Sequence, residues 1–457
     1  MLQRLPKQGG VGTAAASKCP VSTIIWILAA WVLLFQVYTT LYPPPTALTH
    51  PKNRVRSIIR YTEYEEPEFN RLPLPPNRNG KKRRPDYIEE FWSSSHKRQI
   101  YFPNKSSAID PLTNNEDDRF YFHPGREWHD SQGRPIQAHG GGILYIPETR
   151  TFYWYGENKD GRTYHISKHS TARVDVIGIN CYSSTDLWLW KNEGIVLKAD
   201  ERNVSSDLHV SKVVERPKVI YNDKTRKYVM WMHIDNANYS KASVGVAVSL
   251  KPEGPFKYLG SAQPHGFDSR DMTVFKDGDG TAYIIYSSEG NSELHVTVLA
   301  EDYLGFRNIM SRVLVHGYRE APAVFKHRGL YYMITSGCTG WAPNTALVHS
   351  AESMLGSWQL MGNPCVGGNE ELRDTTFFSQ GTFVLPLPGI PDMFIFMADR
   401  WNPYDLRDSR YVWLPLTMDG PADEPLEDVF EFPLWSRVSI HWYQKWKLPQ
   451  DWDKVQI

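Results

Sequence analysis

Five polar side chains stand at matched positions along the C-terminal part of this chain, and three of them are carboxylic acids. Each lies four to six residues ahead of an apolar anchor residue; the five are His139, Glu215, Asp271, Glu320 and Gln380. Carboxyl groups gathered in one pocket cannot all ionise cheaply, so the pKa of one of them should rise. A carboxyl that stays protonated near neutral pH can act as a general acid, and paired carboxyls around a pocket are typical of glycoside hydrolysis.

The elements that must position these side chains are five predicted hairpins, each an apolar strand, a turn and an aromatic-rich strand. Their anchors are Tyr145, Tyr221, Phe275, Phe325 and Leu385, with spacings of 76, 54, 50 and 60 residues. Turn residues such as Asn222-Asp223 and Arg328-Gly329 stand where hairpins need them. Spacings of this size suit four-stranded blades, so the repeats predict an all-β, five-bladed β-propeller whose first strands meet at one axial pocket. A β-sandwich built from hairpins is the alternative.

The composition excludes several classes of protein. Lys and Arg number 51, as do Asp and Glu, and this zero net charge argues against a general nucleic-acid binder. Four cysteines in 457 residues cannot form a disulfide scaffold, although Cys338 and Cys365 could pair. Aromatic residues make up 13% of the chain, which suits strands; the rings could also stack on sugars, but a tightly packed core is the simpler explanation. The 15 histidines show no zinc-like spacing.

The N-terminal part predicts a membrane anchor and a stem. Residues 21–42 carry no charge, and at about 1.5 Å per residue they are long enough for a hydrocarbon core of about 30 Å. We therefore expect a cytosolic tail at 1–20, an uncleaved transmembrane signal anchor at 21–42, a proline-rich stem at 43–110 and the propeller domain at 111–457. Sequons at Asn104, Asn203 and Asn238 all follow the anchor, which favours a lumenal body. This layout predicts a single-pass type II protein of the Golgi membrane.

The sequence resembles glycoside hydrolase family 43 and, within it, the exo-β-1,3-galactanase branch. The motifs that carry the resemblance run in order from Trp128 to Pro415: QAHGGG, FYWYGEN, SRDMTVFKDGDG, REAPAVFKHRGLYYMITSGCTGWAPN, SQGTFVLP and MADRWNPYDLRDSRYVWLP. The resemblance implies a five-bladed propeller and an inverting hydrolase. It also implies that galactose is released from the β-1,3-galactan backbones of arabinogalactan proteins, with no cofactor required; a structural Ca²⁺ stays open but is not indicated.

The same resemblance assigns roles to the polar residues. Glu320 matches the general acid, and Asp271 matches the aspartate that orients the acid and modulates its pKa. Glu215 matches a second pocket carboxylate, and Gln380 stands where this branch has an unusual glutamine. The expected substrate contacts are Glu157, Tyr239, Asn291, Thr339, His139 and Trp341.

Two departures from the wider family bear on the chemistry. Most of the family has a base aspartate on the first blade, where this chain has His139. The base role then falls on Gln380, as an imidic acid, or on Glu215 or Glu157 through water; we expect Gln380 to hold the water. The second departure is Gly290, where an asparagine is expected, so one sugar hydrogen bond would be lost.

Other functions stay open at this point. One is a different family 43 activity, such as an α-L-arabinofuranosidase or a β-xylosidase. Another is a glycan-binding pseudo-enzyme, which the missing base aspartate motivates. A glycosyltransferase shares the anchor-and-stem layout, but its metal-binding Asp-x-Asp would have to be Asp277-Gly-Asp279, which is better explained as a hairpin turn.

Overall fold

The computed structural model describes residues 101–113, 118–165, 172–390, 392–418, 437–449 and 452. All of them belong to one compact unit, Ile58–Ile457. The predicted tail, the anchor and residues 43–100 of the stem lie outside the described residues. None of the described helices is both long and apolar enough to span a membrane. Within the remainder of the predicted stem, Tyr101 and Ile109 are buried in the core.

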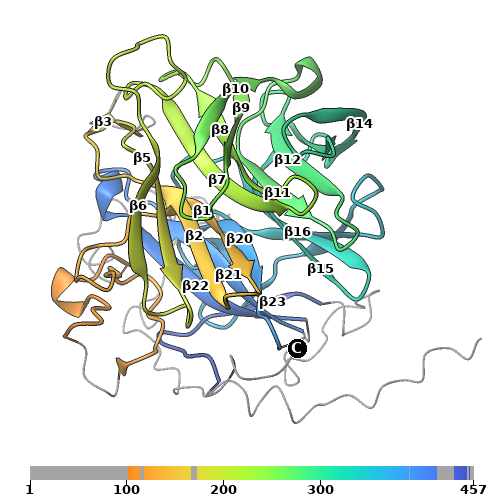
Figure 1. Cartoon of the computed structure of the whole chain (residues 1–457). Coiled ribbons are helices and arrows are strands. Elements are labelled where there is room, and N and C mark those ends of the chain that lie inside the picture. The colour runs from red at the N-terminus through yellow and green to blue at the C-terminus, as the bar shows by residue number, and fades with distance from the viewer. Residues whose placement is uncertain are drawn as a thin grey trace, which may run out of the picture. The chain divides into compact units, whose positions relative to one another are not determined.

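Five sheets of mainly antiparallel strands make up most of the described fold (Figure 1), and the first two strands of each sheet form one of the predicted hairpins. The first sheet contains β1 (His139–Ile146), β2 (Thr151–Glu157), β5 (Gly178–Ser184) and β6 (Lys191–Lys198). The second contains β7 (Val213–Asn222), β8 (Lys227–Asp235), β9 (Ser243–Ser249) and β10 (Lys257–Ala262). The third contains β11 (Met272–Lys276), β12 (Ala282–Ser288), β13 (Glu293–Leu299) and β14 (Phe306–Val313).

The fourth sheet contains β15 (Arg319–His327), β16 (Leu330–Gly337), β17 (Leu347–Ala351) and β18 (Gln359–Gly362). The fifth contains β20 (Gln380–Pro386), β21 (Met393–Arg400), β22 (Arg410–Thr417) and β23 (Ser439–His441), with the short β19 (Cys365–Val366) parallel to β23. Two smaller elements lie in connections: the β3–β4 hairpin (Thr163–His165 and Ala172–Val174) between β2 and β5 of the first blade, and helix α5 (Glu370–Asp374) between β19 and β20.

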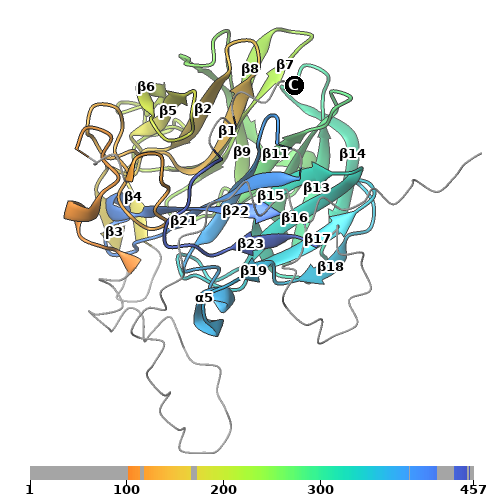
Figure 2. The same cartoon turned by 90° about the horizontal axis from the view of Figure 1, so that it is seen from below.

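The five sheets form a closed ring, as Figures 1 and 2 show. The first strand of each sheet contacts the first strand of the next, and β20 contacts β1 to complete the circle. The predicted five-bladed β-propeller is therefore confirmed, and the sandwich alternative is wrong. The strand character of the C-terminal residues is explained by β23, which supplies an outer strand of the fifth blade.

The hydrophobic core is divided among the five interfaces between neighbouring blades. One cluster joins the first and fifth blades through Trp154 and Trp413, and the others lie between successive pairs of blades. Trp154 stands 4.7 Å from Trp413 between ring centroids, and both are buried. Many of the aromatic side chains therefore pack between neighbouring twisted sheets. A tightly packed core, the simpler explanation of the aromatic composition, accounts for them.

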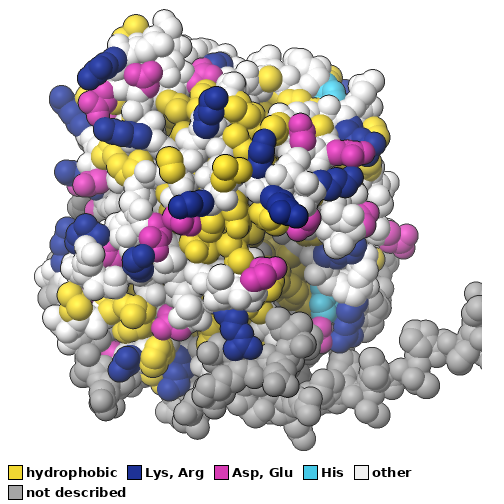
Figure 3. Space-filling view, viewed as in Figure 1, with side chains coloured by type: hydrophobic (Ala, Val, Ile, Leu, Met, Phe, Trp, Pro, Cys, Tyr) yellow, Lys and Arg dark blue, Asp and Glu magenta, His cyan; other side chains and the backbone are white. Residues whose placement is uncertain are grey.

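The surface agrees with the absence of net charge. On the face shown in Figure 3, basic and acidic side chains are interspersed among hydrophobic ones, and neither sign predominates. Asp277 lies in the turn between β11 and β12, where it pairs with Lys326 and Tyr331 of the fourth blade. The Asp277-Gly-Asp279 triplet is thus a hairpin turn that joins two blades, as expected.

Candidate active site

Irregularities at the starts of the first strands turn the polar side chains toward the axis. The register shifts just after His139, Glu215 and Glu320, and again near Gln380. The residue that follows each of the first three has a positive φ: 58° at Gly140, 56° at Arg216 and 50° at Ala321. Such bulges re-aim a side chain locally, and non-glycine residues in this region cost energy that functional sites commonly retain.

Arg216 is the centre of the resulting cluster. Its guanidinium is buried and makes a two-point contact with Asp271, with Nε–Oδ1 3.2 Å and Nη2–Oδ2 2.9 Å. Nη2 also donates to Gln380 Oε1 at 2.5 Å, and Nη1 donates to the Gly381 carbonyl. One cation from the second blade therefore connects candidate residues of the third and fifth blades. Because Gln380 in turn donates to Glu320, the expected convergence of Asp271, Gln380 and Glu320 is observed.

The amide of Gln380 has all four of its hydrogen-bonding positions occupied. Its Oε1 accepts from Arg216 Nη2 and Trp401 Nε1, while its Nε2 donates to Glu320 Oε1 at 3.1 Å and Ser336 Oγ at 2.9 Å. Arginine and tryptophan side chains can only donate, so the oxygen of the amide must face them. This assignment leaves no O–H on Gln380, and the geometry disfavours its imidic-acid form.

Glu320 has the properties of a general acid. It is 8% exposed; Oε1 accepts from Gln380, and Oε2 accepts from Asn291 Nδ2 at 3.3 Å. Burial, followed by the nearby Asp271 carboxylate, raises the pKa of Glu320 to about 8. The carboxyl therefore stays protonated at neutral pH, as a proton donor requires.

Glu215 is held in the opposite state. Its Oε1 accepts from Tyr239 Oη at 3.0 Å, and His233 Nδ1 lies 3.4 Å from its Oε2. Burial alone would raise the pKa of Glu215, but the Lys159 ammonium and His233 outweigh it and lower the pKa to about 2. Glu215 and Glu320 therefore differ in charge, because their environments differ.

Glu157 and Lys159 form a buried ion pair on the first blade. Lys159 Nζ lies 2.5 Å from Glu157 Oε2 and 3.6 Å from Glu215 Oε1, and both members of the pair are 3% exposed. Glu157 Oε1 accepts the backbone N–H of Arg216 at 2.9 Å. Burial raises the pKa of Glu157. Lys159 therefore joins the acidic groups of the first and second blades.

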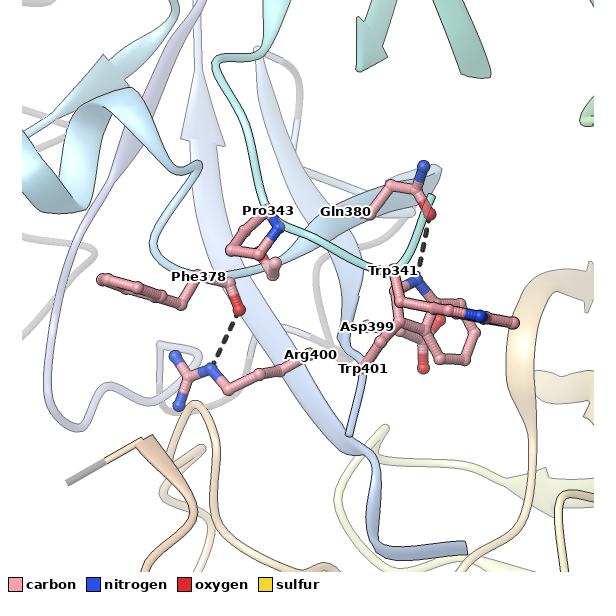
Figure 4. Close-up of a pocket in the computed structure, with 8 residues that line it drawn as sticks. Trp341, Pro343, Phe378, Gln380, Asp399, Arg400 and Trp401 are labelled. Atoms are coloured by element: carbon pink, nitrogen blue, oxygen red, sulfur yellow. Dashed lines mark hydrogen bonds between the residues drawn. The ribbon is translucent and has the colours of Figure 1, made fainter. Parts of the chain in front are cut away.

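Two tryptophans supply an aromatic wall. Trp341, from the loop after β16, and Trp401, which follows β21, stand edge to face with ring centroids 5.1 Å apart. Figure 4 shows them beside Gln380 in a pocket that Pro343, Phe378, Ser379, Asp399 and Arg400 also line. A second pocket, lined in part by Glu157, Lys159 and Glu215, adjoins the acidic side. Flat rings next to polar groups are suited to binding a sugar.

Two expected sugar contacts occupy positions that do not favour that role. His139 is fully buried; its Nδ1 lies 2.8 Å from Asp399 Oδ1, and its ring stacks on Tyr411. It therefore positions Asp399 beneath the pocket instead of lining it. The hydroxyl of Thr339 donates to the Ala342 carbonyl at 2.6 Å, which stabilises the loop that carries Trp341.

The remaining sequence expectations concern Gly290 and the cysteines. The backbone N–H of Gly290 donates to Asp268 Oδ2 at 3.1 Å, and nothing lies within 4 Å of the position a Cβ would take. A larger side chain would therefore extend into open space, so the expected loss of one contact at this position is compatible with the structure. Cys338 and Cys365 are both free thiols, so the suggested disulfide is wrong.

Three residues of the polar cluster have the side-chain types of metal ligands. Glu215, His233 and Asp271 offer ligand atoms within 4.8 Å of one another. However, Arg216 already pairs with Asp271, Lys159 lies beside Glu215, and Asp235 and Glu215 raise the pKa of His233 to about 9 against the effect of burial. These three cations balance the carboxylates, so the donor set does not fit an additional divalent cation.

Four residues of this site were missed from the sequence: Lys159, Arg216, Asp399 and Trp401. Each adjoins a residue or motif that was recognised, as Arg216 follows Glu215 and Lys159 stands two residues after Glu157. For Lys159 and Arg216 the available signal was a charged residue close to a candidate carboxylate, and for Asp399 and Trp401 it was their place in the motif MADRWNPYDLRDSRYVWLP. Their partners come from other blades, so the contacts themselves could not be inferred.

Comparison with known proteins supports this description. The family model for glycosyl hydrolases family 43 matches residues 153–398. A solved family 43 β-1,3-galactosidase with bound galactodeoxynojirimycin is 38% identical, with a TM-score of 0.63, and the alignment covers 72% of this chain and 100% of that one. The exo-β-1,3-galactanase of Phanerochaete chrysosporium, solved with galactose, is 38% identical over 65% of this chain and 64% of that one, with a TM-score of 0.57.

A curated relative, a β-D-galactofuranosidase of Aspergillus niger, is 30% identical over 142 residues. The match covers 29% of this chain and 41% of the length of that relative. All three similar proteins act on galactosyl linkages according to their names, although in different ring forms.

Proposed function

This chain belongs to glycosyl hydrolases family 43, and from that premise we propose that it is an inverting exo-β-1,3-galactosidase. Its substrate is the β-1,3-galactan backbone of arabinogalactan glycans, from which it releases terminal galactose. The observation that carries the proposal is a protonated Glu320 that Gln380 holds beside the pocket of Trp341 and Trp401, in the same polar cluster as an ionised Glu215. Similarity to β-1,3-galactosidases over most of the propeller supports the choice of galactose.

The chemical step begins with Glu320. Gln380 and Asn291 each donate to one of its oxygens and hold the carboxyl in place, and its acidic proton passes to the departing glycosidic oxygen. Burial and, after it, the Asp271 carboxylate, which Arg216 holds through Nε and Nη2, keep the pKa of Glu320 high. A water molecule attacks the anomeric carbon from the opposite face, and the configuration inverts without a covalent intermediate.

The geometry favours a different role for Gln380 from the one expected. A base in an inverting glycosidase stands roughly 6.5–9.5 Å from the acid, whereas Gln380 Nε2 is 3.1 Å from Glu320 Oε1. Its fully occupied amide supports a role in orienting the acid, not in holding the water. The proton of the water then passes to Glu215 or Glu157, which come from the second and first blades.

No metal or other cofactor is required in this proposal. Lys159, Arg216 and His233 supply the positive charge that a cation would otherwise bring to the carboxylates. Activity should therefore survive treatment with EDTA.

We also propose the cellular setting that the sequence predicts: a type II protein of the Golgi membrane, anchored by residues 21–42, with its propeller in the lumen. The three sequon asparagines are exposed at Asn104, Asn203 and Asn238, which is compatible with glycosylation there. Alkaline carbonate extraction and glycosidase sensitivity of the full chain test the anchor and the lumenal side separately.

The function is tested by secreting residues 95–457 and profiling the sugars released from de-branched arabinogalactan and from β-1,3-galactobiose. Galactose should be the sole early product, and the Glu320→Gln variant should release none. Preferential release of arabinose or xylose from aryl glycosides would instead indicate another family 43 activity. Binding of galactan with no reducing-end release would indicate a glycan-binding protein.

A further inference from the structure

Three consecutive non-glycine residues with a left-handed backbone lead into the strand that carries Gln380. Their φ angles are 51° at Thr376, 57° at Phe377 and 54° at Phe378, and only Ser379 separates this left-handed turn from Gln380 at the start of β20. L-amino acids adopt this conformation at a cost in free energy, and then usually as single residues. A run of three persists only where the surrounding contacts determine it, and strain of this kind is concentrated at functional sites.

Arg400, the last residue of the neighbouring strand β21, supplies such contacts. Its Nη2 donates to the Phe377 carbonyl at 2.8 Å, and its Nε donates to the Phe378 carbonyl at 3.0 Å. Nη1 donates to the Tyr101 carbonyl at 2.7 Å, in the segment that precedes the propeller. Figure 4 shows the side chain directed toward the Phe378 carbonyl and away from the two tryptophans. The guanidinium therefore holds the backbone of the left-handed turn.

The burial of this cation is costly, and the fold makes room for it. Arg400 is 3% exposed, its charged neighbour is Arg410, and no carboxylate among the described residues pairs with it. A buried charge without a counterion is tolerated only when hydrogen bonds offset its desolvation. Gly125 leaves the necessary space, because a Cβ at that position would clash with Nη1 of Arg400. All three printed bonds of the guanidinium go to backbone carbonyls, two of them in the left-handed turn.

Strand β21 also pairs with Gln380 itself. Gln380 lies opposite Asp399 in the ladder between β20 and β21, so Arg400 is the residue that follows its partner. The ladder is irregular just beyond this pair, where the register shifts between Gly381 and Phe383. Regular strand pairing therefore does not by itself place Gln380, and the left-handed turn on its other side must contribute.

We propose that Arg400 is a positioning residue, which holds the left-handed turn so that the amide of Gln380 meets the carboxyl of Glu320. This inference rests on the proposed function, because it takes Glu320 as the general acid. The Nε2 of Gln380 donates to Glu320 and favours the ionised carboxyl, so this bond lowers the pKa of Glu320. Loss of the turn geometry should therefore raise the pKa of Glu320 and slow the chemical step.

The test measures the pKa of Glu320 in the full chain without turnover. Infrared titration follows the C=O stretch of its protonated carboxyl, which Glu320→Gln identifies by removing it. We expect a midpoint near pH 8 in the parent protein. In Arg400→Met the midpoint should rise by about one pH unit, and kcat on β-1,3-galactobiose should fall about 10-fold. All variants keep the other titratable or charged groups that face Glu320, which are Asp271, Arg216 and Cys338.

Three further variants separate geometry from charge and from stability. Arg400→Lys keeps the charge but cannot bind three carbonyls in the same planar arrangement, so its midpoint should also rise. Gly125→Ala should displace the guanidinium and reproduce the effect, and it carries the test if Arg400→Met does not fold. Arg410→Met is the matched control, because Arg410 lies opposite Arg400 on β22 and is equally buried but pairs with acidic side chains. It should lower Tm and leave the midpoint in place.

The outcomes distinguish the two proposals. An unmoved midpoint in folded Arg400→Met or Gly125→Ala, or an equal shift in Arg410→Met, overturns the role of Arg400. So does a shift in Arg400→Met that is absent in Arg400→Lys, because the effect would then be one of charge alone. A shift that follows the loss of the guanidinium contacts, in a protein that hydrolyses no β-1,3-galactobiose, supports the role of Arg400 and contradicts the proposed hydrolase.

Discussion

Gln380 donates a hydrogen bond to Glu320 across 3.1 Å, and this contact orients the carboxyl that is the proposed general acid. The amide is itself held by Arg216 and Trp401, so residues of the second and fifth blades determine the geometry of an acid from the fourth. The catalytic proposal depends on this chain of contacts more than on any single side chain.

Removal of the acid should separate turnover from binding. Glu320→Gln keeps the shape and the hydrogen bonds of the side chain but has no proton to donate. We expect kcat on β-1,3-galactobiose to fall by about 10²- to 10⁴-fold, the usual contribution of general acid catalysis, while the affinity for galactose changes little. Kinetics and calorimetry on the same preparation check both quantities. Near-normal turnover would remove Glu320 from the mechanism.

Position 380 distinguishes an orienting residue from a base. Gln380→Glu places a second carboxyl within about 3 Å of Glu320, where like charges disfavour ionisation of one of the two. We expect kcat to fall by 10-fold or more and the alkaline limb of the pH profile to move upward; Gln380→Ala should also lower kcat. Activity of Gln380→Glu at or above that of the parent enzyme would show that this position accepts the proton of the water.

The remaining carboxylates can be compared in the same assay. If Glu215 or Glu157 takes the proton from the water, the Gln variant of that residue should lose kcat and the acidic limb of the profile. The variant of the other residue should mainly raise KM, because it loses a sugar contact. Loss of the acidic limb in neither variant would exclude both residues as the base.

The alkaline limb itself should follow Glu320. Its pKa is raised to about 8, so the protonated, active form is present below that pH and is lost above it. Asp271→Asn removes the like charge and leaves Arg216 unpaired nearby, and both effects lower the pKa of Glu320. The alkaline limb of kcat/KM should therefore move to lower pH. A limb that stays in place would mean that another group controls it.

His233 predicts how the stability of the fold depends on pH. Asp235 and Glu215 overcome the effect of burial and raise the pKa of His233 from 6.5 to about 9. A raised pKa in the folded state adds stability that is fully present below the unfolded pKa of about 6.5 and disappears as the pH rises through 9. His233→Asn should flatten the dependence of Tm on pH between these values. An unchanged slope, measured by thermal denaturation, would contradict the assignment.

The sequence predicted the architecture because the repeated hairpins carry local signals. The sequence alone shows the turn residues, such as Asn222 and Gly329, and the aromatic residues of the second strands, because neither signal depends on tertiary contacts. The starts of the first strands were identified for the same reason, since a blade places them at the axis. Glu215, Asp271, Glu320 and Gln380 were therefore found, and the structure brings them together around Arg216.

Long-range contacts were not predictable in the same way. The burial of His139 depends on Asp399, a residue 260 positions away, and the four bonds of Gln380 come from two other blades and its own. Lys159 looked like an ordinary lysine until Trp341 and Trp401 were placed beside it. The sequence identified most of the candidate site residues, but their hydrogen-bond partners depend on the fold and could not be predicted.

The anomeric configuration of the first product tests the central claim most directly. Proton NMR during hydrolysis of β-1,3-galactobiose by the secreted enzyme resolves the two anomers of newly released galactose before they interconvert. The account predicts that α-galactose appears first, because water attacks the face opposite Glu320. First appearance of β-galactose, or no galactose at all, would contradict it.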